Sequence, residues 1–246
     1  FKLSKKKNFV TTISDIKKKN EFSNIKNFYN KNKKDIFFEN HPKKIIKKAN
    51  LIVITPGIIK SDKDLKSILK NKKTISEIDF FQKLSRWPYQ KIISVTGSYG
   101  KTTVCNYLQK KLINTKKIKK IFYAGRANRT LCSLPKYKKN YLLISEIDYQ
   151  LLAPSRNFCA KYNIISSLNN SANHIFKNSK LYYKCKAKLI SNNRKKNFLV
   201  LSKKTFSKIK INKIGNSNVI IKKNYANSIL QSKVLVNEIV ELIKYK

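Results

Sequence analysis

One short segment constrains the fold more than any other: an apolar run, a turn with two glycines, and a Lys-Thr pair that opens a helical pattern. The run is Lys91–Val95, the turn is Thr96–Gly100, and Lys101 and Thr102 follow directly. Apolar residues then recur every four positions, which predicts an amphipathic helix over 101–114, with Val104, Leu108 and Leu112 on its buried face. In a strand, glycine turn and helix of this kind, backbone N–H groups and the positive helix end face a phosphate.

The candidate phosphate-binding residues are consecutive: Gly97, Ser98, Tyr99, Gly100, Lys101, Thr102 and Thr103. We expect Lys101 to reach the terminal phosphates of ATP and the Thr102 hydroxyl to ligate Mg²⁺. The standard phosphate loop has a further glycine five residues before its second one, where this chain has Val95. A chance Gly-Lys-Thr in a lysine-rich chain is therefore the alternative interpretation.

The remaining apolar runs predict the fold class. Short runs that end at turns are typical of buried parallel strands, and here they occur at 51–54, 121–123, 141–144, 162–165, 198–201 and 219–221. Helical patterns at 180–192 and 226–244 lie between or after them. Strands alternating with helices predict an α/β protein with a doubly wound sheet. The Trp87-Pro88-Tyr89 segment suggests a small domain at 1–88 and a larger one at 89–246.

Composition narrows the class of protein. Hydrophobic residues make up 41% of the chain, enough for a core, and no apolar run approaches the length of a membrane span. We therefore expect a soluble cytoplasmic protein without a membrane partner. The formal charge of +44 would attract polyanions. Nearly all of it is lysine, however, whereas specific nucleic-acid binders favour arginine, so we expect no specific nucleic-acid partner. The four cysteines lack metal-binding spacing and are expected to be free thiols.

Seven segments occur in an order that points to one known family. They are Leu51–Ile58, Thr96–Thr102, Gly125–Asn128, Glu146–Leu151, Leu168–His174, Tyr182–Leu189 and Asn224–Asn227. With Thr-Gly-x-x-Gly-Lys-Thr at their centre, they resemble the motifs of the Mur ligase family, most closely those of its D-glutamate-adding members. The resemblance implies a partial Rossmann-like, UDP-substrate-binding domain at 1–88 and a central ATPase domain at 89–246. It also implies a further amino-acid-binding domain outside these 246 residues, which also contain no Met.

The resemblance implies a reaction and a set of site residues. A substrate carboxylate would attack the ATP γ-phosphate, and the incoming amine would displace the acyl phosphate. The implied substrates are UDP-N-acetylmuramoyl-L-alanine and D-glutamate, with ATP and Mg²⁺ as cofactors and a monomer as the active form. Lys101, His174 and a carbamylated Lys186 would be catalytic. Thr102, Glu146, His174 and Lys186 would hold metal ions, Asn224 and Asn227 the nucleotide, and Gly57, Asn128 and His174 the substrate.

Three alternatives stay open at the level of sequence. Asn173, Asp148 and Lys223 depart from the family pattern, so the chain is either a diverged ligase or a degenerate nucleotide-binding relic. Its charge alone would also suit a basic, nucleic-acid-associated NTPase. Individual residues carry plainer interpretations as well: Lys186 as a solvated lysine, and Asn224 and Asn227 as helix caps.

Overall fold

The computed structural model describes residues 9–22, 26–55, 57–58, 63, 66–67, 70–71, 73–126, 129–169, 175–176, 178–191, 196–209 and 217–244. Two of the expected site residues, Asn128 and His174, lie outside them. Internal contacts divide the chain into two compact units, Phe1–Ile52 and Val53–Lys246. This division falls earlier than residue 88, because the segment before Trp87 packs within the second unit. Among the described residues, every helix is too short or too polar to traverse a bilayer.

The first unit is small and has a parallel strand pair. β1 (Ile13–Ser14) pairs with β2 (Ile36–Phe37), and the Asp15 amide donates to the Phe37 carbonyl oxygen at 3.0 Å. Helix α2 (Lys26–Asn32) lies between these strands in sequence, and α3 (Lys43–Lys48) follows β2. Such short elements carry too little alternation to be predicted from the sequence alone.

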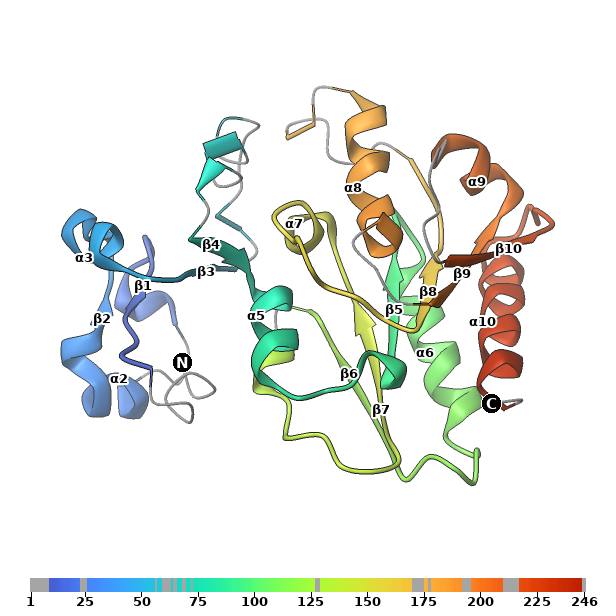
Figure 1. The fold of residues 1–246 in the computed structure, drawn as a ribbon, viewed down its shortest axis with the longest axis horizontal. Helices are drawn as coiled ribbons and strands as arrows, with labels where there is room; N and C mark the ends of the chain where they lie inside the picture. Colours follow the sequence, from blue (N-terminus) through green and yellow to red (C-terminus); the bar gives the residue numbers. More distant parts are fainter. Residues whose placement is uncertain are drawn as a thin grey trace. The chain divides into compact units, whose positions relative to one another are not determined.

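The second unit is built on a six-stranded parallel sheet in the order β10-β9-β8-β5-β7-β6 (Figure 1). Each of its strands coincides with an expected apolar run, which confirms the predicted fold class. The strands are β5 (Ile92–Thr96), β6 (Lys120–Ala124), β7 (Tyr141–Glu146), β8 (Tyr162–Ile165), β9 (Asn197–Ser202) and β10 (Ser217–Lys222). After β5 the chain forms β6 and β7 on one side of that strand within the sheet, and it then crosses over to form β8, β9 and β10 on the other side. The carboxyl end of β5 is therefore the topological switch point, where α/β proteins bind ligands.

Helices cover both faces of this sheet because its strands are apolar on both sides. Phe198 and Val200 of β9 belong to the core cluster with α6 (Lys101–Leu112) and α10 (Ser228–Lys244). The alternating residues Leu199 and Leu201 join the opposite cluster, with α8 (Ser179–Ser191) and α9 (Lys203–Ile209). The period of two in the strand thus sends alternate side chains to opposite helix layers. All three expected long helices are confirmed as α6, α8 and α10.

Several shorter elements of the second unit were not expected. They are β4 (Thr74–Ser76) and the helices α5 (Glu77–Leu84), α7 (Tyr149–Leu152) and α9. The strand expected at 51–54 is β3 (Ile52–Ile54), which pairs with β4 in a separate two-stranded sheet. α5 begins at the N-cap Ser76, whose hydroxyl accepts from the Asp79 amide at 3.3 Å. The apolar side of α5 faces the protein interior, so Ile78 and Phe81 are fully buried.

A single carboxylate fastens α5 to the loop that leads into β8. The buried Asp79 side chain accepts from the Ser155 hydroxyl at 2.8 Å and from three successive backbone amides, those of Arg156, Asn157 and Phe158, at 2.9, 3.2 and 2.8 Å. The Gln82 side-chain amide adds a reciprocal pair of bonds to the Cys159 backbone, both 2.7 Å. Charge-assisted bonds of this kind are the stronger class, so α5 is an integral part of the larger unit.

Replacing Asp79 by Ala should therefore destabilise the protein strongly. The change leaves buried amides without an acceptor, and we expect a loss of about 3 kcal/mol in the free energy of unfolding, measured by urea denaturation. The matched control is Glu241→Ala, which removes an exposed carboxylate paired with Lys244 and should cost about 0.5 kcal/mol or less. Equal effects of the two changes would contradict an anchoring role for Asp79.

Candidate functional site

The glycine turn joins the fully buried strand β5 to the first residue of α6. Gly97 and Gly100 both have positive φ, +150° and +78°. Gly100 is the N-cap of α6, and no side chain caps that helix end. The residues expected to surround a phosphate, Gly97–Thr103, therefore form one continuous loop and first helical turn. We refer to Gly97–Lys101 as the phosphate loop.

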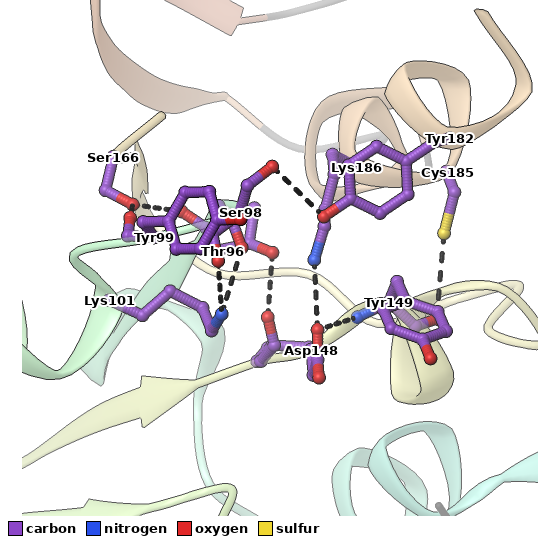
Figure 2. Close-up of polar contacts among 12 residues, drawn as sticks. Thr96, Ser98, Tyr99, Lys101, Asp148, Tyr149, Ser166, Tyr182, Cys185 and Lys186 are labelled. Atoms are coloured by element: carbon purple, nitrogen blue, oxygen red, sulfur yellow. Dashed lines mark hydrogen bonds and ion pairs between the residues drawn. The ribbon is translucent and has the colours of Figure 1, made fainter. Parts of the chain in front are cut away.

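The segment after β8 lies directly against this loop. We call Ser166–Asn169 the serine strap. The Ser98 amide donates to the Ser167 carbonyl oxygen at 3.0 Å. The Ser166 Oγ lies 2.5 Å from the Tyr99 carbonyl oxygen and 3.2 Å from that of Thr96 (Figure 2). A Cβ on Gly97 would stand 2.1 Å from the Ser166 Oγ and 3.0 Å from the Ser167 backbone nitrogen. Gly97 is thus favoured by the close approach of the strap as well as by its φ.

Lys101 turns back along its own loop. Its Nζ donates to the Gly97 carbonyl oxygen at 3.0 Å and lies 3.5 Å from that of Ser98 (Figure 2). The ammonium group is therefore held beside the loop backbone at the start of α6. Together with the positive end of the helix dipole, it concentrates positive charge at the carboxyl end of β5.

The carboxylate of Glu146 lies at the same edge of the sheet as the phosphate loop. Glu146 is the last residue of β7, the strand next to β5, and both of its carboxylate oxygens lie 3.2 Å from the Thr102 Oγ1. The Tyr123 hydroxyl also donates to Glu146, and the Arg126 Nε lies 3.9 Å from it. Burial, followed by the bond to Glu146, raises the pKa of Tyr123 above its usual range, so the phenol stays protonated as a donor.

A further glycine with positive φ lies against the backbone of Glu146. Gly125 has φ +104°, and a Cβ there would meet the Glu146 carbonyl oxygen at 2.1 Å. The Gly125 amide also donates to the Arg129 carbonyl oxygen at 2.8 Å. The chain after β6 can therefore pass close to the end of β7 only because residue 125 has no side chain.

Lys186 is not one of the solvated lysines. Its side chain is fully buried on α8, with Nζ 3.3 Å from the Asp148 Oδ1 and 5.7 and 5.3 Å from the ring centres of Tyr149 and Tyr182 (Figure 2). Burial lowers the pKa of Lys186, and the neighbouring Asp148 carboxylate opposes part of that effect. The Tyr182 hydroxyl lies 3.2 Å from the Ser98 Oγ, so α8 also contacts the phosphate loop.

Both asparagines expected near the nucleotide cap helices. The Asn227 Oδ1 accepts from the Ile229 and Leu230 amides at 2.8 and 3.2 Å at the start of α10. The Asn224 Oδ1 accepts from the Lys204 amide at 2.9 Å at the start of α9. Gly57 has φ +98°, and a Cβ built there would meet no atom within 4 Å in the described part of the chain.

The structure therefore brings together the loop residues, Thr102 and Glu146, and places Lys186 beside Asp148. In the described part of the chain, no group of three His, Cys, Asp or Glu side chains is close enough together to hold a metal ion. Sequence reasoning missed Tyr123, Arg126 and the serine strap. Tyr123 is the last residue of a predicted strand, and Arg126 follows that strand. A position at the end of a strand is a signal for candidate site residues at this edge of the sheet. Ser166 and Ser167 gave no such signal.

The fold resembles those of solved ligases. No protein-family model and no curated protein matches the chain. It is similar to the UDP-N-acetylmuramate:L-alanyl-gamma-D-glutamyl-meso-diaminopimelate ligase from Neisseria meningitides, with a TM-score of 0.55 and 11% identity over 97% of this chain and 87% of that one. It is also similar to the MurF ligase from Thermotoga maritima in complex with ADP, with a TM-score of 0.50 and 13% identity over 80% of this chain and 61% of that one.

At such identities the likeness establishes the fold. The chain has the α/β fold seen in structures of Mur ligases, with the parallel sheet that carries its phosphate loop. It spans less than two thirds of the MurF structure.

Two glycine substitutions separate backbone strain from a backbone clash. Gly125→Ala adds a Cβ that collides with the Glu146 carbonyl oxygen, so we expect a loss of about 3 kcal/mol or more in the free energy of unfolding. Gly57→Ala, the matched control, has an equally positive φ but open space around it, and should cost only about 1 kcal/mol. Denaturant unfolding of both variants gives the comparison. Similar losses would show that the approach of residue 125 to β7 is not tight.

Replacing the buried Lys186 by Met should stabilise the protein near neutral pH. Its folded-state pKa is lowered, so below that pKa the folded state carries the full penalty of a buried ammonium, and the penalty disappears as pH rises to the ordinary lysine value. We expect a gain of about 1 kcal/mol at neutral pH that shrinks toward about pH 10. Lys184→Met on the exposed side of α8 is the control and should show neither effect. A Lys186→Met variant less stable than wild type at neutral pH would contradict this expectation.

Proposed function

We propose that this chain is the nucleotide-binding part of an ATP-dependent ligase of the Mur type, which joins a carboxylate to an amine. One observation carries the proposal: the Thr102 hydroxyl, just after the phosphate loop, is 3.2 Å from both oxygens of the Glu146 carboxylate at the end of the neighbouring strand. A loop that can surround phosphates and a carboxylate beside its threonine are the two halves of a site for a nucleotide with a divalent cation.

The residues present fit Mg²⁺. A hydroxyl and a carboxylate are the hard oxygen ligands that this ion prefers, and it commonly takes only one or two carboxylates together with phosphate oxygens and water. Thr102 and Glu146 would hold it, and when bound it would neutralise charge on the phosphates. Tyr123 and Arg126 would orient the Glu146 carboxylate through the contacts described above.

The chain's own residues favour phosphoryl transfer from ATP to a carboxylate. Two anions must meet in that step, so the site has to concentrate positive charge on the transferring group. Lys101 and the N-terminus of α6 supply it. The substrate carboxylate oxygen forms a bond to the γ-phosphorus as the bond to ADP breaks. The amine then attacks the acyl carbon of the acyl phosphate, loses a proton and expels inorganic phosphate.

Lys186 is the proposed second cationic or, when carbamylated, anionic group of this site. Burial disfavours its ammonium form, and a neutral amine is the form that reacts with carbon dioxide. His174, which lies outside the described residues, is proposed to act with it at a second metal ion. Asn224 and Asn227 are proposed to lie near the base of the nucleotide while capping their helices, and Gly57 and Asn128 to contact the acyl substrate.

For the substrates we propose UDP-N-acetylmuramoyl-L-alanine and D-glutamate, because the order and spacing of the motifs are most like those of the D-glutamate-adding ligases. A ligase for another muramoyl acceptor is the second candidate, favoured by the structural likeness to a UDP-N-acetylmuramate ligase. Assays of ATP turnover with a panel of UDP-muramoyl acceptors distinguish the two.

Lys101→Met should reduce acceptor-dependent ATP turnover at least about 100-fold, because it removes the charge held at the transferring phosphate. Lys110→Met, an exposed lysine on the same helix, is the matched control and should leave turnover unchanged. Phosphate release with and without the UDP-muramoyl acceptor gives the measurement.

The same assay tests the proposed function against its alternatives. Stimulation by UDP-N-acetylmuramoyl-L-alanine supports the ligase. Stimulation by DNA or RNA would point instead to a nucleic-acid-associated NTPase, and a wild-type protein that does not bind ATP would be a degenerate relic.

A further inference from the structure

The phosphate loop is attached to the serine strap at both backbone polar groups of one residue, Tyr99. The Ser167 Oγ accepts from the Tyr99 amide at 3.0 Å and lies 3.0 Å from the Tyr99 carbonyl oxygen. The Ser98 amide donates to the Ser167 carbonyl oxygen. One serine thus binds two successive amides of the loop, one through its backbone and one through its hydroxyl.

The serine strap also forms hydrogen bonds with the side chain of Ser98. The Ser98 Oγ accepts from the Asn169 amide at 2.8 Å and donates to the Asn169 carbonyl oxygen. Tyr99 itself, by contrast, is 62% exposed. The position of residue 99 therefore depends on its backbone contacts with Ser166 and Ser167.

The amides that follow are left for a ligand. Gly100 begins α6 without a side-chain cap, so the first amides of that helix, at Lys101, Thr102 and Thr103, have no acceptor among the described residues. Donors at a helix start need an acceptor, and an anion provides one. The strap thus occupies the amides of Ser98 and Tyr99 and leaves those of the helix start for phosphate.

We propose that Ser167 is a positioning residue, whose hydroxyl clamps the Tyr99 peptide and so holds the phosphate loop in its anion-binding shape before the nucleotide arrives. This inference rests on the proposed function, because it specifies how the same site is preorganised. Preorganisation strengthens binding by reducing the entropy lost when the loop is ordered around its ligand.

The close approach at Gly97 supports the clamp independently. A Cβ at residue 97 would lie 3.0 Å from the Ser167 backbone nitrogen as well as 2.1 Å from the Ser166 Oγ. The loop and the strap are therefore in contact through backbone atoms, and a small shift of either one moves the other. A hydroxyl at residue 167 sits at the centre of that contact.

The test is Ser167→Ala, which removes the clamp and keeps the backbone bond to Ser98. The first measurement is amide hydrogen exchange by NMR without nucleotide, in which the Tyr99 amide should exchange about tenfold faster while the Ser98 amide is unchanged. The second is the Kd for Mg-ATP, which should rise about tenfold without a change in the melting temperature. Ser167→Thr retains a hydroxyl and should restore both values.

Ser133→Ala is the matched control, since its exposed hydroxyl also donates to a backbone carbonyl, that of Thr130, at 2.7 Å. It should change neither measurement. An Mg-ATP affinity of Ser167→Ala equal to or tighter than that of wild type would overturn the inference, because the hydroxyl would then be irrelevant or would compete with phosphate.

Failure of the proposed function gives a different result. In that case the wild-type protein itself does not bind Mg-ATP, and the clamp is judged by Tyr99 amide exchange alone. Unchanged exchange in Ser167→Ala would then reject the clamp, whereas faster exchange restored by Ser167→Thr would support it as a structural contact.

Discussion

The close contact between the phosphate loop and the two strands beside β5 is the constraint on which the rest of the site depends. β5 lies between β7 and β8, so the loop that leaves it meets the ends of both neighbours. On one side Thr102 meets Glu146, and on the other the loop backbone meets the serine strap. The approach of the strap to the loop explains the glycine at 97, and the approach of the chain after β6 to the Glu146 backbone explains the glycine at 125.

The role of a positively charged side chain in this protein depends on its surroundings, which the net charge does not describe. The chain carries 56 Lys and Arg against 12 Asp and Glu. Two of these lysines were expected in the site. The Lys101 ammonium is held by loop carbonyl oxygens, and Lys186 is enclosed by Asp148 and two tyrosine rings. The contacts of each lysine, and not the number of lysines, therefore separate these two from a solvated side chain.

The sequence predicted the large elements well because they are strongly patterned. The apolar runs of the sheet and the long amphipathic helices correspond to observed elements, and the glycine turn lies where expected, between β5 and α6. The short elements, α5, α7 and the two-residue strands, were missed because a few residues carry no readable period. The domain boundary expected at 88 also differs from the division of contacts at 52, since Asp79 and Gln82 attach α5 to a loop about 75 residues later in the chain.

For the candidate site, the sequence by itself determined the strand, the glycine turn and the helix that begins at Lys101, because these are all local features. Glu146 and Lys186 were predicted as site residues from the resemblance, and the sequence did not show what surrounds them. Asn227 caps α10 through bonds to amides two and three residues later, which is a local contact. Tertiary structure decided that Asn224 caps α9, that Lys186 is buried against Asp148, and that Ser167 contacts the Tyr99 backbone. These last three contacts join segments distant in sequence. The order of strands in the sheet brings them together, and that order follows from how the whole core packs, which no local pattern encodes.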